Sequence, residues 1–222
     1  MQWIDIETEL TTAGTNLILA AVALYALVQI LRSRPTQSVA QRAAVWAIAF
    51  GFLTVAALLG FFAHAFVLSE AAEFLIWQPL FLSLGLTLSF FAIGVIIDLV
   101  ELPASGPLIG AFVAAGVGFY AATLFLPGGF LVFIAYEAVL LVFALVSYAI
   151  LSVRARVRYA HWMLAGIAVS IAAAAIQATG ALSFRLIWQL DHNGIFHLVQ
   201  VVGVVLLARG IVNRPAARRR RG

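Results

Sequence analysis

The sequence predicts an all-α integral membrane protein: one bundle of seven transmembrane helices, with the N-terminus outside and the C-terminus in the cytoplasm. Three observations predict this class. Of the 222 residues, 64% are hydrophobic and only 10% are charged, whereas soluble domains average about half apolar and a quarter charged. Seven apolar segments are long enough to cross about 30 Å of hydrocarbon at about 1.5 Å per residue. All basic residues are arginines, and they gather in alternate connections.

The seven predicted spans cover residues 15–31, 43–67, 72–99, 107–126, 129–151, 161–183 and 193–212. The residues before the first span are acidic, where a signal peptide would be basic, so this segment is predicted to be a true helix. Proline and glycine mark short connections after the first, third and fourth spans, which predicts antiparallel neighbours. Residues 1–14 form a predicted acidic extracytoplasmic N-terminus, residues 15–213 one transmembrane domain, and residues 214–222 an Arg-rich cytoplasmic tail.

The arginine positions predict the orientation of the bundle. Arginines cluster in the first connection, in the fifth connection and at the C-terminus, and Arg185 alone lies on the opposite side. By the positive-inside rule the C-terminus is cytoplasmic and the number of helices is odd. We therefore predict a multi-pass protein of the plasma membrane, in a bacterium the inner membrane. The Arg-rich tail is explained by topology, and no nucleic-acid partner is predicted.

Two absent residue types exclude several functions. Without cysteine the chain has no disulfides, no thiolate metal ligands and no cysteine nucleophile. Without lysine it forms neither a side-chain Schiff base with retinal nor a Walker-A phosphate site.

Polar residues within the spans gather in one half of the predicted membrane. An ionisable side chain is costly in hydrocarbon, so each one is a candidate functional residue. Helix direction places the outer-half set at His64, Gln78, Glu137, Gln177 and the segment 191–200. Asp98 and Glu101, at the inner end of the third span, are predicted to be solvated surface charges.

Three histidines belong to the outer-half set: His64, His192 and His197. Three imidazoles with one open position are typical of catalytic zinc. His192 lies about 140° from His197 on an ideal helix, so it joins the others only if the first turn is irregular. Asp191 or Asn193 is the expected N-cap of this helix. The alternative is that His64 and His197 only form interhelical hydrogen bonds.

Glu137 is the predicted buried carboxylate, about two turns inside the fifth span. It is a candidate general base, a proton relay or a partner of a histidine ligand. A purely structural alternative is a neutral acid hydrogen-bonded to Gln177.

These residues give the chain a resemblance to a known superfamily. The helix-two segment Leu59–His64 and the helix-seven segment Ile195–Val199, with seven helices and an external N-terminus, resemble the seven-helix membrane hydrolases that include alkaline ceramidases and adiponectin-receptor-like proteins. The resemblance implies a zinc ion held by one histidine of helix two and two of helix seven, and cleavage of a lipid amide. Where that family has a histidine, a serine and an aspartate, this chain has Asn193, Gly60 and, nearest in position, Gln78.

The leading hypothesis is a zinc-dependent membrane hydrolase that cleaves an amide or ester of a membrane lipid. His64, His192 and His197 would hold zinc, Glu137 or Asp191 would take a proton from the bound water, and Gln78, Asn193 and Gln200 would support substrate or ligands. The alternatives are a haem-binding electron carrier that uses His64 and His197, a proton-coupled transporter of a small solute through Glu137, and a structural subunit.

Overall fold

The fold is a bundle of long helices. The computed structural model describes residues 2–33, 40–126, 129–155 and 158–213. In these ranges seven helices are long and apolar enough to cross a membrane: α1 (Glu7–Ser33), α2 (Ala40–Ala65), α3 (Glu70–Val100), α4 (Gly106–Phe125), α5 (Gly129–Ala155), α6 (Arg158–Thr179) and α7 (His192–Val212). The predicted class of a multi-pass, all-α membrane protein is confirmed. The predicted Arg-rich tail lies outside the described residues.

The boundaries differ from the prediction where polar or extended segments meet the helices. Helix α1 begins at Glu7, inside the predicted acidic tail, because acids are favourable in the first turn of a helix. Helix α2 ends at Ala65, and the next two residues form β2 (Phe66–Val67), which pairs with β1 (Gln2–Trp3). Helix α6 ends at Thr179, before a hairpin of β3 (Phe184–Arg185) and β4 (Gln189–Leu190).

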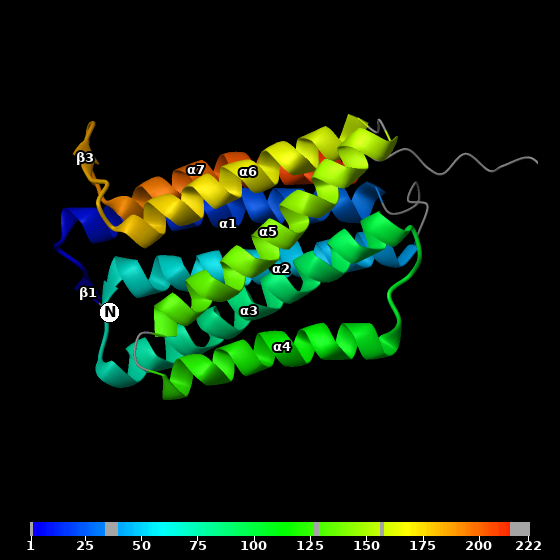
Figure 1. Ribbon diagram of the computed structural model, residues 1–222. Helices are drawn as coiled ribbons and strands as arrows, with labels where there is room; N and C mark the ends of the chain where they lie inside the picture. Colours follow the sequence, from blue (N-terminus) through cyan, green and yellow to red (C-terminus); the bar gives the residue numbers. More distant parts are fainter. Residues whose placement is uncertain (1, 34–39, 127–128, 156–157, 214–222) are drawn as a thin grey trace, which may run out of the picture.

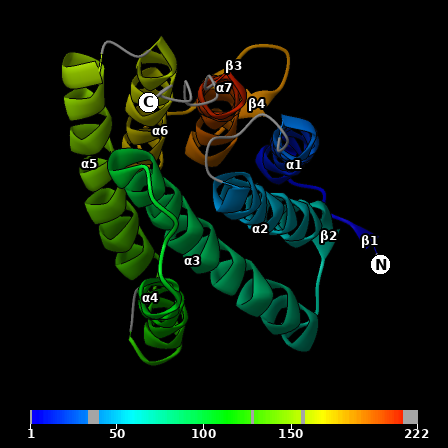
Figure 2. The same cartoon turned by 90° about the vertical axis from the view of Figure 1, so that its right-hand side faces the viewer.

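Six of the helices form a closed ring, and α4 lies outside it (Figures 1 and 2). Around the ring, α1 packs against α2, α2 against α3, α3 against α5, α5 against α6, α6 against α7, and α7 against α1. Helix α4 packs against α3 and α5. We call the end of the bundle where α1 begins the N-terminal end, and the opposite end the C-terminal end.

The contact between α3 and α4 depends on two glycines. A Cβ atom at Gly85 would lie 2.7 Å from the backbone oxygen of Gly116, so the helices touch through their backbones there. In the sequence, Gly110, Ala114 and Gly118 form a row of small residues four positions apart, which predicts helix packing through that face. A Cβ atom at Gly110 or Gly118 would meet nothing within 4 Å. Helix α4 therefore packs on a different face from the predicted one.

A buried charged cluster closes the C-terminal end. The guanidinium of Arg42 on α2 donates to both carboxylate oxygens of Asp98 on α3, and its Nη1 donates to the carbonyl of Ile211 at 3.0 Å. The hydroxyl of Tyr148 on α5 donates to Asp98 Oδ2 at 2.6 Å. Arg42, Asp98 and Tyr148 are all fully buried. The prediction that Asp98 is a solvated surface charge is wrong, because its face of α3 turns toward α2 and α5.

Candidate functional site

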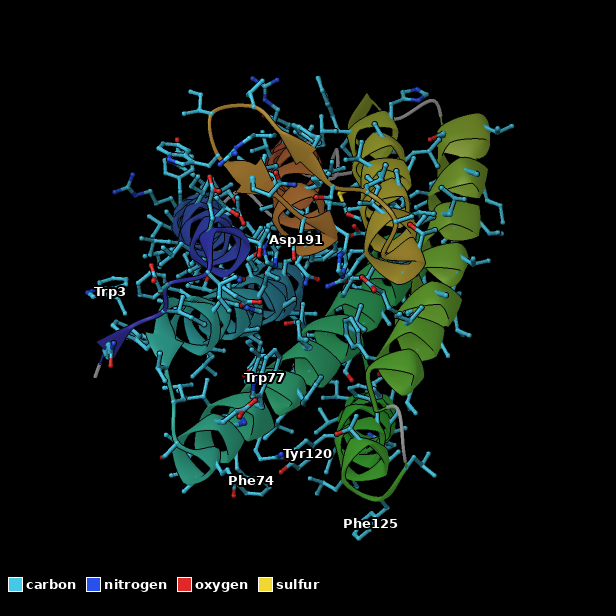
Figure 3. All side chains as sticks on the ribbon, turned by 90° about the vertical axis from the view of Figure 1, so that its left-hand side faces the viewer. Trp3, Phe74, Trp77, Tyr120, Phe125 and Asp191 are labelled. Carbon is cyan, nitrogen blue, oxygen red and sulfur yellow. The ribbon has the colours of Figure 1, made fainter. Side chains whose placement is uncertain are left out.

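A cavity of about 530 Å³ occupies the centre of the ring. Residues of every helix except α4 line it. It runs from His64 to Ala49 along α2 and from His192 to Leu207 along α7, a length of about 22 Å at 1.5 Å per residue. In Figure 3, which looks onto the N-terminal end, the labelled Asp191 and Trp77 lie on facing sides of the ring. The cavity therefore extends inward from the N-terminal end.

Most of the predicted polar residues line this one cavity. The imidazoles, one carboxylate and the amides come together from α2, α5, α6 and α7: His64, Glu137, Gln177, His192, Asn193, His197 and Gln200. The rest of the lining is mainly apolar, with leucine, alanine and phenylalanine side chains. Two of the predicted residues, Gln78 and Asp191, are not among the described residues that line the cavity. The cavity is thus polar near the N-terminal end and apolar at depth.

A threonine of α1 orients His197. The Nδ1 atom of His197 lies 3.1 Å from Thr15 Oγ1, and the Thr15 hydroxyl donates to the carbonyl of Thr12 at 2.9 Å. Because a hydroxyl has one proton, Thr15 must accept a hydrogen bond from Nδ1–H of His197. The neutral imidazole then carries its lone pair on Nε2. His197 therefore offers the cavity an acceptor or a metal ligand.

A glutamate of α1 orients His64. The Nδ1 atom of His64 lies 2.6 Å from Glu9 Oε2, so Nδ1–H donates to the carboxylate. This again leaves Nε2 of the neutral ring as the atom with the lone pair. A carboxylate or carbonyl partner on the far nitrogen is typical of histidines that bind metals, since it fixes both the tautomer and the ring orientation.

The third histidine does not complete a metal site. His192 is the first residue of α7 and lines the cavity. Within the part of the chain that the structure describes, no three His, Asp or Glu side chains come close enough to hold one metal ion. The structure thus brings His64, His192 and His197 to one cavity but does not assemble them into the predicted three-histidine cluster.

Asp191 is the N-cap of α7. It is one of the two residues, with Asn193, that the sequence predicts for this role. Its Oδ1 accepts from the backbone N–H of Gly194 at 2.9 Å and from the hydroxyl of Thr12 at 2.9 Å. Its Oδ2 accepts from Asn193 Nδ2 at 3.5 Å. Asp191 therefore fixes the start of α7 and joins it to α1.

Glu137 is buried, with 9% of its surface exposed, and lines the cavity. Its Oε2 atom has no hydrogen-bond partner among the described residues. Gln177, the partner expected in the structural alternative, donates instead to Asn193 Oδ1 at 3.4 Å. Four further buried oxygens also lack a described partner, those of Gln78, Ser152, Ser170 and Gln200, and of these Ser170 and Gln200 line the cavity. Such groups cost about 1–3 kcal/mol each unless a ligand or water bonds to them.

Sequence reasoning missed the contribution of α1. Glu9, Thr12 and Thr15 contact the histidines and the α7 cap, and Asn16 lines the cavity. Thr15 and Asn16 follow Thr12 by three and four positions, which places all three near one face of an apolar helix. That spacing is the signal that could have identified them.

Asn16 also occupies the space beside Gly60. A Cβ atom at Gly60 would lie 2.7 Å from Asn16 Oδ1. The amide of Asn16 therefore fills the space that a side chain at position 60 would need.

Fold and cavity together define a class: a seven-helix membrane protein with a polar cavity at one end of its bundle. The chain belongs to a family of unknown function (DUF6962), whose model matches residues 11–215. No curated protein and no solved structure matches the chain.

Proposed function

We propose that the protein is a membrane hydrolase that cleaves an amide or ester bond of a lipid within the central cavity. One observation carries the proposal: two imidazoles, each with Nδ1 held by α1, line the same cavity as a buried carboxylate that has a partnerless oxygen. Oriented imidazoles beside an acid are the groups that activate water for hydrolysis. The resemblance of the segments around His64 and His197 to ceramidase-like hydrolases supports the same reaction.

The lining of the cavity supports a lipid substrate. Its deep part is formed by apolar side chains such as Phe50, Leu53 and Val204, which suit an acyl chain. Its polar part lies near the N-terminal end, where the scissile group would meet His64 and His197. We place this end outside the cell, in the plasma membrane, from the arginine distribution.

The cavity fits a zinc ion in part. His64 and His197 each present Nε2, the atom that binds zinc when Nδ1 is held by a partner. The third ligand would be His192, which requires a movement of its side chain. When bound, zinc would acidify a water molecule toward neutrality and polarise the scissile carbonyl.

The roles of the other residues follow from their contacts. Glu137 would take a proton from the attacking water, because one of its oxygens is free of described partners. Asp191 is occupied with Gly194 and Thr12, so we assign it to positioning α7 rather than to proton transfer. Gln200 and Asn193 line the cavity and would bind polar groups of the substrate.

Metal analysis of the purified protein tests the zinc site. We expect about one zinc per chain in the wild type and a large loss in His64→Ala and His197→Ala. His161→Ala is the matched control, since His161 is exposed at the start of α6, at the opposite end of the bundle, and its loss should leave the metal content unchanged. Wild-type protein purified without chelators and free of zinc would overturn the metal assignment.

Release of fatty acid from lipid amides and esters in vesicles tests the hydrolase. We expect turnover by the wild type and by His161→Ala, and loss of turnover in His64→Ala, His197→Ala and Glu137→Gln. Equal turnover in the Glu137→Gln variant would contradict the role of Glu137.

The partnerless carboxylate of Glu137 also supports a second candidate, a proton-coupled transporter. Solute uptake into proteoliposomes that responds to a pH gradient and disappears in Glu137→Gln would favour transport. A Soret band in the purified protein would favour a haem held by His64 and His197.

A further inference from the structure

The hairpin between α6 and α7 has one polar side and one apolar side. Strands β3 and β4 pair antiparallel, with Phe184 opposite Leu190 and Arg185 opposite Gln189. The three residues 186–188 form the turn, where the N–H of Leu186 donates to the carbonyl of Trp188 at 3.3 Å. The hairpin is therefore a defined element rather than an irregular connection.

Polar groups of the hairpin are directed toward α1. Arg185 Nη2 donates to Glu7 Oε2 at 2.7 Å, and the backbone N–H of Gln189 donates to Glu7 Oε1 at 3.1 Å. The hydroxyl of Thr11 donates to the carbonyl of Gln189 at 2.8 Å. These bonds hold the hairpin against the first helix and satisfy its charged residue.

The turn exposes large apolar side chains. Leu186, Ile187 and Trp188 are 79%, 74% and 64% exposed, and Leu182 and Phe184 are about half exposed. No acidic residue occurs between Gly180 and Leu190. Apolar surface of this kind is not stable in water and marks a contact with another molecule or with a membrane.

The position of the hairpin favours the membrane. It leaves the bundle at the ends of α6 and α7, and Figure 1 shows it directed across the helix axes rather than along them. The ends of membrane-spanning helices lie at the headgroup level, where tryptophan is enriched. The exposed turn thus lies beside the bundle, at the level of the lipid headgroups that would surround the helix ends.

We propose that the hairpin is an interfacial anchor: residues 186–188 insert into the headgroup and acyl boundary of the leaflet at the N-terminal end. The ligand of this surface is the lipid bilayer itself. The anchor precedes Asp191 and His192 directly, so it holds the start of α7 and the polar end of the cavity at the height of the lipid headgroups. It does not depend on hydrolysis or on a metal.

The absence of cysteine from the chain allows a direct test. A single nitroxide label is attached to Ile187→Cys in the full-length protein in phosphatidylcholine vesicles. Its collision rates with oxygen, which concentrates in lipid, and with a water-soluble nickel chelate are measured by electron paramagnetic resonance. Two single-cysteine variants supply references: Val142→Cys on the exposed face of α5 for lipid, and Asp5→Cys in the exposed N-terminal segment for water.

We expect the ratio of oxygen to nickel collisions at position 187 to exceed that at position 5 severalfold and to approach that at position 142. A ratio equal to that at position 5 would show a turn in water and overturn the anchor. Low collision rates with both reagents would show a protein contact and overturn it as well. Because Ile187 is an exposed turn residue, the label should not disturb folding, and helicity measured by circular dichroism checks this.

Discussion

The buried charged cluster and the central cavity treat buried polar groups in opposite ways. At the C-terminal end, Arg42 and Tyr148 both donate to Asp98, and all three side chains are fully buried. In the cavity, Glu137 and Gln200 each have a buried oxygen without a described partner. Since burial without a bond costs free energy, the first arrangement stabilises the fold and the second is maintained at the expense of stability. The contrast supports the cavity as the place of the proposed function.

Removal of the carboxylate of the C-terminal cluster is expected to have the largest effect on stability. Asp98→Ala leaves the charge of Arg42 buried without its main counter-charge, so we expect the free energy of unfolding to fall by about 3–5 kcal/mol. Unfolding of the protein in detergent micelles, followed by circular dichroism, measures it. In the double variant Arg42→Met with Asp98→Leu, most of the stability should return. A loss below about 1 kcal/mol in Asp98→Ala would contradict the structural role.

The next effect concerns a single hydrogen bond of the same cluster. Tyr148→Phe removes the hydroxyl that donates to Asp98 and keeps the ring. A hydrogen bond to a charged group contributes about 1.5–3 kcal/mol, and we expect a loss of this size in the same unfolding assay. Tyr25→Phe, a change at an exposed position on α1, is the control and should have no measurable effect.

The cavity should respond in the opposite direction. In Glu137→Leu, an apolar side chain replaces a buried carboxylate that has a partnerless oxygen, so we expect the free energy of unfolding to rise by about 1–2 kcal/mol. If the protein is the proposed hydrolase, turnover of lipid should be lost in the same variant. Greater stability with less activity is the combination that identifies a functional group, and a destabilised Glu137→Leu protein would count against it.

The smallest effect on stability is expected at Glu9. The pair of Glu9 and His64 is partly exposed, and such pairs contribute less than about 1 kcal/mol. If His64 binds zinc, however, Glu9→Gln should reduce zinc affinity about 10–100-fold, because the carboxylate fixes the ring. Zinc titration of the purified variant measures this. Glu70→Gln, which changes an exposed acid at the start of α3, should leave the affinity unaltered.

The helices could be predicted from the sequence because their apolar length is a local property. The face of α7 could be predicted as well, since Asn193, His197 and Gln200 follow helical spacing and all line the cavity. The contacts of α1 could not, because threonine hydroxyls are tolerated in any span and only tertiary packing shows which atoms they meet. Burial of Asp98 likewise depends on how α2 and α5 pack against α3.

Glu9 is a second residue whose contact could not be predicted from the sequence. Its charge and position agree with an external tail, and the sequence explains it fully as a topology signal. Only the fold brings it to His64, which is more than fifty residues away along the chain. Local sequence pattern therefore cannot identify residues that act through a partner far away along the chain.

The contact between Asn16 and Gly60 has a consequence for the evolution of the family. The two residues share one small volume, so a larger side chain at position 60 cannot appear while the asparagine keeps its place. Relatives that carry serine or alanine at the position of Gly60 should therefore carry either a smaller residue at that of Asn16 or an asparagine whose amide is turned toward the cavity. Substitutions at these two positions should be correlated across the family.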